Sequence, residues 1–214
     1  MIQEYIKNNC IFNADDYTGI PDSSVISRTI PVSKVIERLD ALFIKNMYDE
    51  AESFLCKWII CANAKGDWKS HLSLLSELID LYRSTTETAL ALEAIKSATD
   101  ILKSHNWGNT VQGATVLWNI ANALNDFGCT ETSVDYFNYV LEVYSSFLEP
   151  NDCKMARLYN DLALSYFELN EYTLAERFYD LAINVVNKNL STRNDDSTYH
   201  YLAQVYGKTL IEIP

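Results

Sequence analysis

The side chains best suited to metal binding or cross-linking are five cysteines and three histidines, scattered along the sequence. Zinc sites and disulfide frameworks use tighter or paired spacing, whereas these cysteines are odd in number and form no C-x-x-C pair. None of the histidines stands beside a second ligand at helical spacing. We therefore expect incidental or buried thiols, no bound metal, no cofactor and no structural disulfide. The residues are Cys10, Cys56, Cys61, Cys129, Cys153, His71, His105 and His200.

Catalytic chemistry would need a constellation that the sequence does not contain. The phosphate-binding, metalloprotease and serine-hydrolase motifs G-x-G-x-x-G, G-x-x-x-x-G-K-[ST], H-E-x-x-H and G-x-S-x-G are all absent. The adjacent carboxylates Asp15 and Asp16, like Asp195 and Asp196, lie in turn-like segments, where aspartate usually caps helices and shapes turns. We predict that the protein is not an enzyme.

Composition and charge narrow the class of protein and of partner. Hydrophobic residues make up 48% and charged residues 21% of the chain, which is typical of a globular protein with a buried core. The formal net charge of -12 disfavours nucleic acids and anionic membranes. No stretch is apolar enough to span a bilayer, and the N-terminus does not resemble a signal peptide. We expect a cytoplasmic protein that binds neither nucleic acid nor membrane.

Residues 1–31 and residues 32–214 differ in pattern. The first segment carries Asn-Asn, Asp-Asp, Thr-Gly and Ile-Pro-Asp-Ser-Ser, which are turn signals, and we interpret it as an N-terminal arm or irregular cap. From about Ser33 onward, apolar residues recur at spacings of three and four, which predicts amphipathic helices. The predicted helices are 33–45, 48–63, 70–84, 88–104, 110–127, 130–147, 153–169, 172–188 and 197–211.

These helices pair into a repeating unit. Three copies of its first helix read Leu75-x-x-Leu78-Ile79-x-x-Tyr82, Leu117-x-x-Ile120-Ala121-x-x-Leu124 and Tyr159-x-x-Leu162-Ala163-x-x-Tyr166. The steps from 78 to 120 and from 120 to 162 are both 42 residues, and an equal period predicts a repeat architecture. A looser copy, Tyr199-x-x-Leu202-Ala203-x-x-Tyr206, predicts a last, unpaired capping helix.

The repeating unit resembles the tetratricopeptide pattern W-x-x-L-G-x-x-Y followed by A-x-x-x-F. Ala163, Ala175 and Ala182 occupy the positions where small residues let two helices approach closely. The usual period of that family is 34, so this chain looks like the long-repeat variety found in kinesin light chains and in bacterial regulatory and scaffold proteins. We expect an all-α, right-handed superhelical array of antiparallel helix pairs, with about four repeats and a C-terminal capping helix.

In such an array the first helix of each pair lines the concave side. On each first helix, the positions three and four residues from the core positions are expected to be exposed. They carry amides, aromatics and single charges, which suit an extended peptide. Asparagine can donate to and accept from a peptide backbone, although Asn122 and Asn160 could instead bond neighbouring helices. The predicted groove comprises Asp80, Arg83, Trp118, Asn119, Asn122, Asn125, Arg157, Asn160, Leu164, Phe167, His200, Tyr201 and Gln204, with Glu77 and Asp161 at adjacent positions.

The resemblance implies a protein- or peptide-binding adaptor or scaffold. Arg83 and Arg157 are too few to form the basic cluster with which relatives hold a C-terminal carboxylate, so that activity is not carried over. Two alternatives stay open at this stage. One is a signalling-peptide receptor module of a bacterial regulatory system, and the other is a structural unit that self-associates through its terminal helix.

Overall fold

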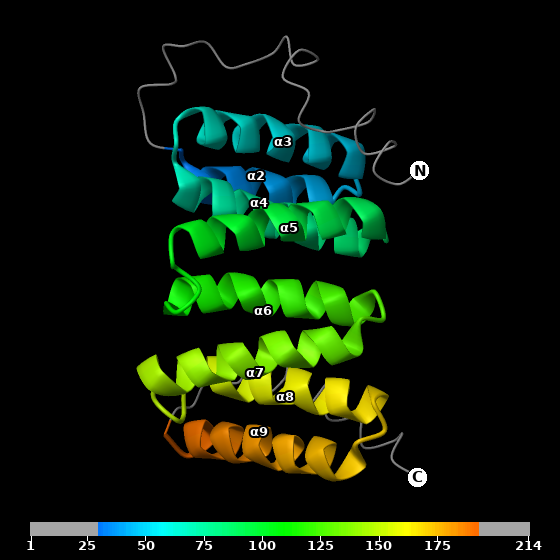
Figure 1. Cartoon of the computed structure of the whole chain (residues 1–214), viewed down its shortest axis with the longest axis vertical. Coiled ribbons are helices and arrows are strands. Elements are labelled where there is room, and N and C mark those ends of the chain that lie inside the picture. Colours follow the sequence, from blue (N-terminus) through cyan, green and yellow to red (C-terminus); the bar gives the residue numbers. More distant parts are fainter. Residues whose placement is uncertain (1–29, 193–214) are drawn as a thin grey trace. The chain divides into compact units, whose positions relative to one another are not determined.

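The protein is described by a computed structural model in which residues 30–192 are placed. Contacts divide the chain into two compact units, Met1–Trp107 and Gly108–Pro214. We call residues 30–107 the first unit and residues 108–192 the second unit. The first unit contains α2 (Val32–Phe43), α3 (Tyr48–Ala64), α4 (Trp68–Ser84) and α5 (Thr88–Ser104), and the second contains α6 (Val111–Asp126), α7 (Thr130–Phe147), α8 (Cys153–Glu168) and α9 (Tyr172–Thr192) (Figure 1).

The predicted all-α class is confirmed, since the residues placed between 30 and 192 form α-helices joined by short connections and no strand. Eight of the predicted helices agree with the observed ones to within a few residues. The arm at 1–29 and the predicted helix at 197–211 lie outside the described residues. None of the helices within residues 30–192 has both the length and the apolar character that a membrane span requires.

Helix α4 forms the centre of the first unit, where it contacts α2, α3 and α5. It is buried on two sides because its sequence carries two apolar stripes, each spaced at three and four residues. Each fully buried leucine contributes roughly 1.5–3 kcal/mol of hydrophobic stabilisation. One stripe consists of Leu72, Leu75, Ile79 and Tyr82, and the other of Leu74, Leu78 and Leu81.

The helices of the first unit end in turns of one kind. Asn46, Gly66, Thr86 and Asn106 have φ between 49° and 65°, and they follow one another at intervals of 20 residues. The N–H of the next residue bonds a carbonyl five residues earlier, as from Glu87 to Tyr82 at 2.9 Å. This pattern satisfies the last carbonyls of a helix and needs a left-handed residue, which glycine and asparagine adopt readily and β-branched threonine does not.

The second unit uses the same turn inside each helix pair. Gly128 ends α6 and Asn170 ends α8, with φ of 76° and 63°. The pairs α6/α7 and α8/α9 are joined by a different connection, because Leu148 leaves α7 in an extended conformation and Pro150 follows. Asp152 then caps the N-terminus of α8, because its side chain accepts a hydrogen bond from the Lys154 backbone N–H at 2.8 Å.

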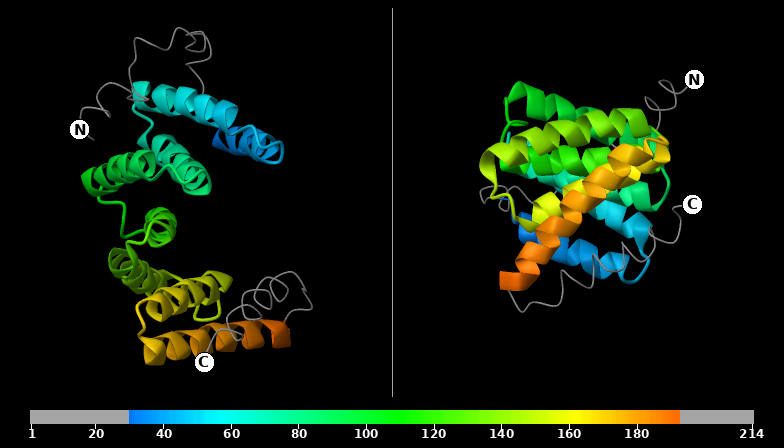
Figure 2. Two further views of the ribbon diagram at one scale, coloured as in Figure 1. Left: turned by 90° about the vertical axis from the view of Figure 1, so that its right-hand side faces the viewer. Right: turned by 90° about the horizontal axis from the view of Figure 1, so that it is seen from below.

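Small residues allow α8 and α9 to pack side by side as an antiparallel pair (Figure 2). Ala163 on α8 and Ala175 and Tyr179 on α9 form one buried cluster. Ala175 is only 2% exposed, which confirms the prediction that it lies where two helices touch. A methyl group at this position permits the close approach that a larger side chain would block.

Candidate functional site

The predicted groove residues of the second unit lie on α6 and α8, but two of them are not exposed. Trp118 is 6% and Asn160 is 3% exposed, so the prediction that both form an exposed stripe was wrong. Arg157 is exposed, and Asn119, Asn122 and Leu164 are partly buried. Trp118 is not exposed because its ring packs among side chains of neighbouring helices.

Trp118 on α6 connects three helices. Its indole Nε1–H donates a 2.7 Å hydrogen bond to Asp161 Oδ2 on α8. The edge of its ring system meets Tyr144 of α7 in a T-shaped contact, with centroids 6.1 Å apart. The guanidinium of Arg157 lies 5.3 Å from the Trp118 ring centroid, within the range of a cation–π interaction. Trp118 therefore links α6 to α7 and α8 within the second unit.

Asp161 is the electrostatic centre of this cluster. Besides Trp118, the side chains of Asn160 and Asn122 donate hydrogen bonds to its carboxylate, and Arg157 acts on it as a nearby positive charge. Burial raises the pKa of Asp161 to about 6, although the three hydrogen bonds and Arg157 each act to lower it. Burial wins because it removes the carboxylate from water, and the pairing offsets only part of that cost.

Asn160 has a fixed orientation beside this carboxylate. An ionised carboxylate only accepts hydrogen bonds, so the amide of Asn160 must turn its Nδ2 group toward Asp161. Its Oδ1 atom is buried and accepts no hydrogen bond from the placed part of the chain. An unsatisfied buried acceptor costs roughly 1–3 kcal/mol, which a suitable donor could recover.

Asn125 serves the packing of the second unit. Its Oδ1 accepts hydrogen bonds from Ser133 Oγ on α7 at 3.0 Å and from Ser165 Oγ on α8 at 3.2 Å. Both serines are buried, at 0% and 1% exposure. The side-chain amide oxygen of Asn125 therefore links α6 to α7 and α8. The sequence had left such a structural role open for Asn122 and Asn160.

Phe167 and Leu164 pack against the cluster of α8 and α9 described above. The Phe167 ring also meets Tyr172 in a T-shaped contact at 5.5 Å between centroids. Both side chains are partly buried, so only part of each surface is open to a partner.

In the first unit, the predicted groove residues pair within their own helix. Arg83 Nη2 lies 3.1 Å from Asp80 Oδ1, one turn away on α4. Burial, together with the carboxylates of Asp80 and Asp40, raises the pKa of Glu77 to about 7. His200, Tyr201 and Gln204, the remaining predicted groove residues, lie outside the described residues.

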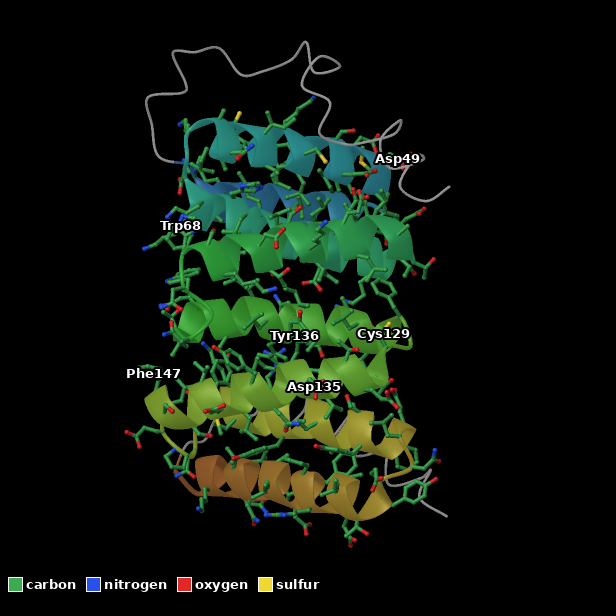
Figure 3. The ribbon with its side chains drawn as sticks, viewed as in Figure 1. Asp49, Trp68, Cys129, Asp135, Tyr136 and Phe147 are labelled. Carbon is green, nitrogen blue, oxygen red and sulfur yellow. The ribbon has the colours of Figure 1, made fainter. Side chains whose placement is uncertain are left out.

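An aromatic cluster that the sequence pattern did not predict lies at the start of α4, where Figure 3 labels Trp68. Trp68 stacks on His105 with ring centroids 4.1 Å apart and makes a T-shaped contact with Trp107 at 5.1 Å. Lys69 Nζ lies 5.4 Å from the Trp68 ring centroid. No periodicity signals this cluster, because Trp68 begins one helix while His105 and Trp107 follow the end of another.

The description of the family model that matches this chain is Tetratricopeptide repeat, and the match covers residues 114–188. This segment lies within the second unit and is similar to tetratricopeptide repeats. The match supports that family for residues 114–188, while the 42-residue period stays a prediction. Comparison with curated proteins gives no match.

Solved structures show the same fold. The crystal structure of BtubC (BKLC) from P. vanneervenii is similar with a TM-score of 0.70 at 20% identity, over 82% of this chain and 72% of that chain. A putative kinesin light chain from Podosopora anserina, with nearly identical TPR-like repeats, gives a TM-score of 0.60 at 15% identity over 91% and 94%. A variant of that protein gives 0.63 at 15% over 89% and 93%. The chain is thus an all-α helical repeat protein.

Proposed function

We propose that this protein is a non-catalytic scaffold that binds an extended segment of another protein through α6 and α8. The observation that carries the proposal is the position of the polar cluster around Asp161. It lies on the first helices of both helix pairs in the segment that carries the tetratricopeptide match. Repeats of this family typically mediate protein interactions.

The chemistry of the cluster suits a peptide backbone. An extended peptide offers an N–H donor at every residue except proline and a carbonyl acceptor at every residue. Arg157 is exposed and Asn119 and Asn122 are partly exposed, so their side chains can hydrogen-bond such a backbone. Arg157 and Asp161 carry opposite charges, so the cluster has little net charge of its own. We therefore expect affinity to depend only modestly on salt, unlike binding driven by the overall charge of -12.

A display library of short, unstructured peptides tests this function with no partner chosen beforehand. Peptides selected on the wild-type protein should bind Arg157→Ala at least about tenfold more weakly, equivalent to roughly 1.4 kcal/mol. Arg177→Ala, which removes an exposed arginine of α9, is the matched control and should bind normally. If the selected peptides bind Arg157→Ala and the wild type equally, the binding face lies elsewhere.

A further inference from the structure

Helix α7 presents two large apolar side chains to solvent. Tyr139 is 44% and Phe147 is 64% exposed, and Figure 3 labels Phe147 at the end of the helix. Tyr139, Val143 and Phe147 are spaced four residues apart, so they form one ridge along the helix surface. Val143 is buried and fixes this ridge to the core of the second unit. Exposed aromatic rings in a row offer a partner protein contact area at a low cost in conformational entropy.

The same ridge continues into acidic side chains toward the start of α7. Glu131 and Asp135 precede Tyr139 at the same spacing of four, and Glu142 follows Tyr139 by three residues. All three carboxylates are exposed. Because side chains three and four apart are neighbours on a helix, the Tyr139 ring lies between Asp135 and Glu142. We call these four side chains, together with Phe147, the outer face of α7.

Helix α7 itself carries no positive charge to offset these carboxylates. The sequence between Lys103 and Lys154 contains neither lysine nor arginine, although it carries six aspartates and glutamates. The second helices of the other pairs differ, since α3, α5 and α9 each contain at least one lysine or arginine. A helix surface that serves only solubility usually mixes both signs of charge, as those helices do. The uniform sign on α7 attracts a cationic partner.

We propose that the outer face of α7 binds a segment of another protein in which lysine or arginine side chains stand beside large apolar ones. A cation of that segment can contact the Tyr139 ring and pair with Asp135 or Glu142 at the same time, because these side chains adjoin. The apolar side chains of the segment cover Phe147. This surface goes beyond the proposed function, because it uses none of the side chains of α6 and α8.

The charge of this face also disfavours other occupants. In a twofold dimer through α7, the same patch of both copies meets, so Asp135 and Glu142 would face carboxylates of the second copy. Like charges across an interface repel one another. Nucleic acids and anionic lipid surfaces are repelled for the same reason. A basic segment of a different protein is therefore the occupant that the charge selects.

Selection of the peptide display library on Arg157→Ala tests this proposal, because that variant weakens the α6 and α8 face. Peptides recovered in low salt should be enriched in lysine or arginine next to leucine or aromatic residues. Their affinity for the protein should fall at least about tenfold between about 0.05 M and about 0.5 M salt, because exposed charges are screened. Peptides without excess basic residues, or an affinity that salt does not change, would overturn the proposal.

Charge reversal on two helices decides where these peptides bind. Asp135→Lys combined with Glu142→Lys should weaken binding at least about tenfold. Glu176→Lys combined with Asp180→Lys, at exposed positions of α9, changes the net charge equally and should weaken binding by less than about threefold. Phe147→Ala should weaken binding about tenfold at both salt concentrations, because it removes an apolar contact.

Leu181→Ala, which removes an apolar side chain of α9 that is 37% exposed, is the matched control for Phe147→Ala and should bind normally. Circular dichroism checks that all variants keep the helix content of the wild type. Equal losses in the two charge reversals would mean that the overall charge attracts the peptides, and the proposal would fail. It also fails if Phe147→Ala binds like the wild type, or if light scattering shows that this variant converts a dimer into a monomer. The variants of α7 leave α6 and α8 unchanged, so failure here and failure of the proposed function are separate results.

Discussion

The two units resemble one another in their helices and differ in how the polar side chains of the predicted groove are used. In the first unit, Asp80 pairs with Arg83 on the same helix, so the pair needs no neighbour to form. In the second unit, Trp118 reaches from α6 to Asp161 on α8, 43 residues later. A pair within one helix leaves the register of its neighbours unspecified, whereas a pair between helices requires one arrangement. The second unit should therefore be the more sensitive to single substitutions in its part of the predicted groove.

The largest expected difference between the units is the loss of stability when a tryptophan is replaced by alanine. Trp118→Ala should destabilise the second unit by about 3–5 kcal/mol, because it opens a cavity and removes a donor from Asp161. Trp68→Ala, in the partly exposed cluster of the first unit, should cost clearly less. Denaturant unfolding followed by circular dichroism measures both. Equal losses in the two variants would contradict the difference drawn between the units.

Overpacking tests the contact between α8 and α9. Ala175→Leu should cost roughly 1–3 kcal/mol of unfolding free energy, because the added atoms have no space between Ala163 and Tyr179. Ala89→Leu, at an exposed position of α5 in the first unit, is the matched control and should change little. Thermal melting of the two variants side by side gives the answer. A wild-type melting temperature for Ala175→Leu would mean that this helix contact is wrong.

Acid should stabilise the first unit through Glu77. Its folded pKa of about 7 lies above the ordinary value of 4.5, so the folded state binds a proton that the unfolded state lacks between those values. Stability therefore rises as pH falls from about 7 to about 4.5, by roughly 1–2 kcal/mol after allowance for the partial exposure of Glu77. Urea unfolding at a series of pH values measures this rise.

Glu77→Gln supplies the control for that series. The amide cannot ionise, so the variant should be more stable than the wild type above pH 7 and should lose this part of the pH dependence. The sign is the same for Asp161 in the second unit, whose pKa is also raised by burial. If Glu77→Gln is less stable than the wild type at about pH 8, the carboxylate is favourably paired and the argument fails.

The smallest expected changes in stability come from substitutions in the turns that end the helices. Thr86 holds φ at 61°, which is unfavourable for a β-branched residue, so Thr86→Gly should stabilise the first unit by about 1 kcal/mol. Gly128→Ala should cost the second unit about as much, through backbone strain alone, since nothing lies within 4 Å of an added Cβ. Melting temperatures measure both changes. A loss of stability in Thr86→Gly would show that the threonine contributes more than its strain costs.

Much of the fold was predictable because its causes are local. The spacing of apolar residues at three and four defines a helix face within a few turns, and residues such as Gly66 and Gly128 end helices wherever they stand. The N-terminal boundary of α8 also has a local cause, because the side chain of Asp152 caps the helix. These features need no knowledge of which helix lies beside which.

The candidate site depended on the tertiary structure. Stepping along α6 placed Trp118 and Asn125 correctly on their helix, yet it assigned both to an open groove. Only the crossing of α6 with α7 and α8 brings Trp118 to Asp161 and Asn125 to Ser133 and Ser165. The sequence by itself determined where the helices run and which faces are apolar. Partners up to 43 residues apart, and the burial that raises the pKa of Asp161, were decided by packing, because a repeat period does not specify how side chains of adjacent helices meet.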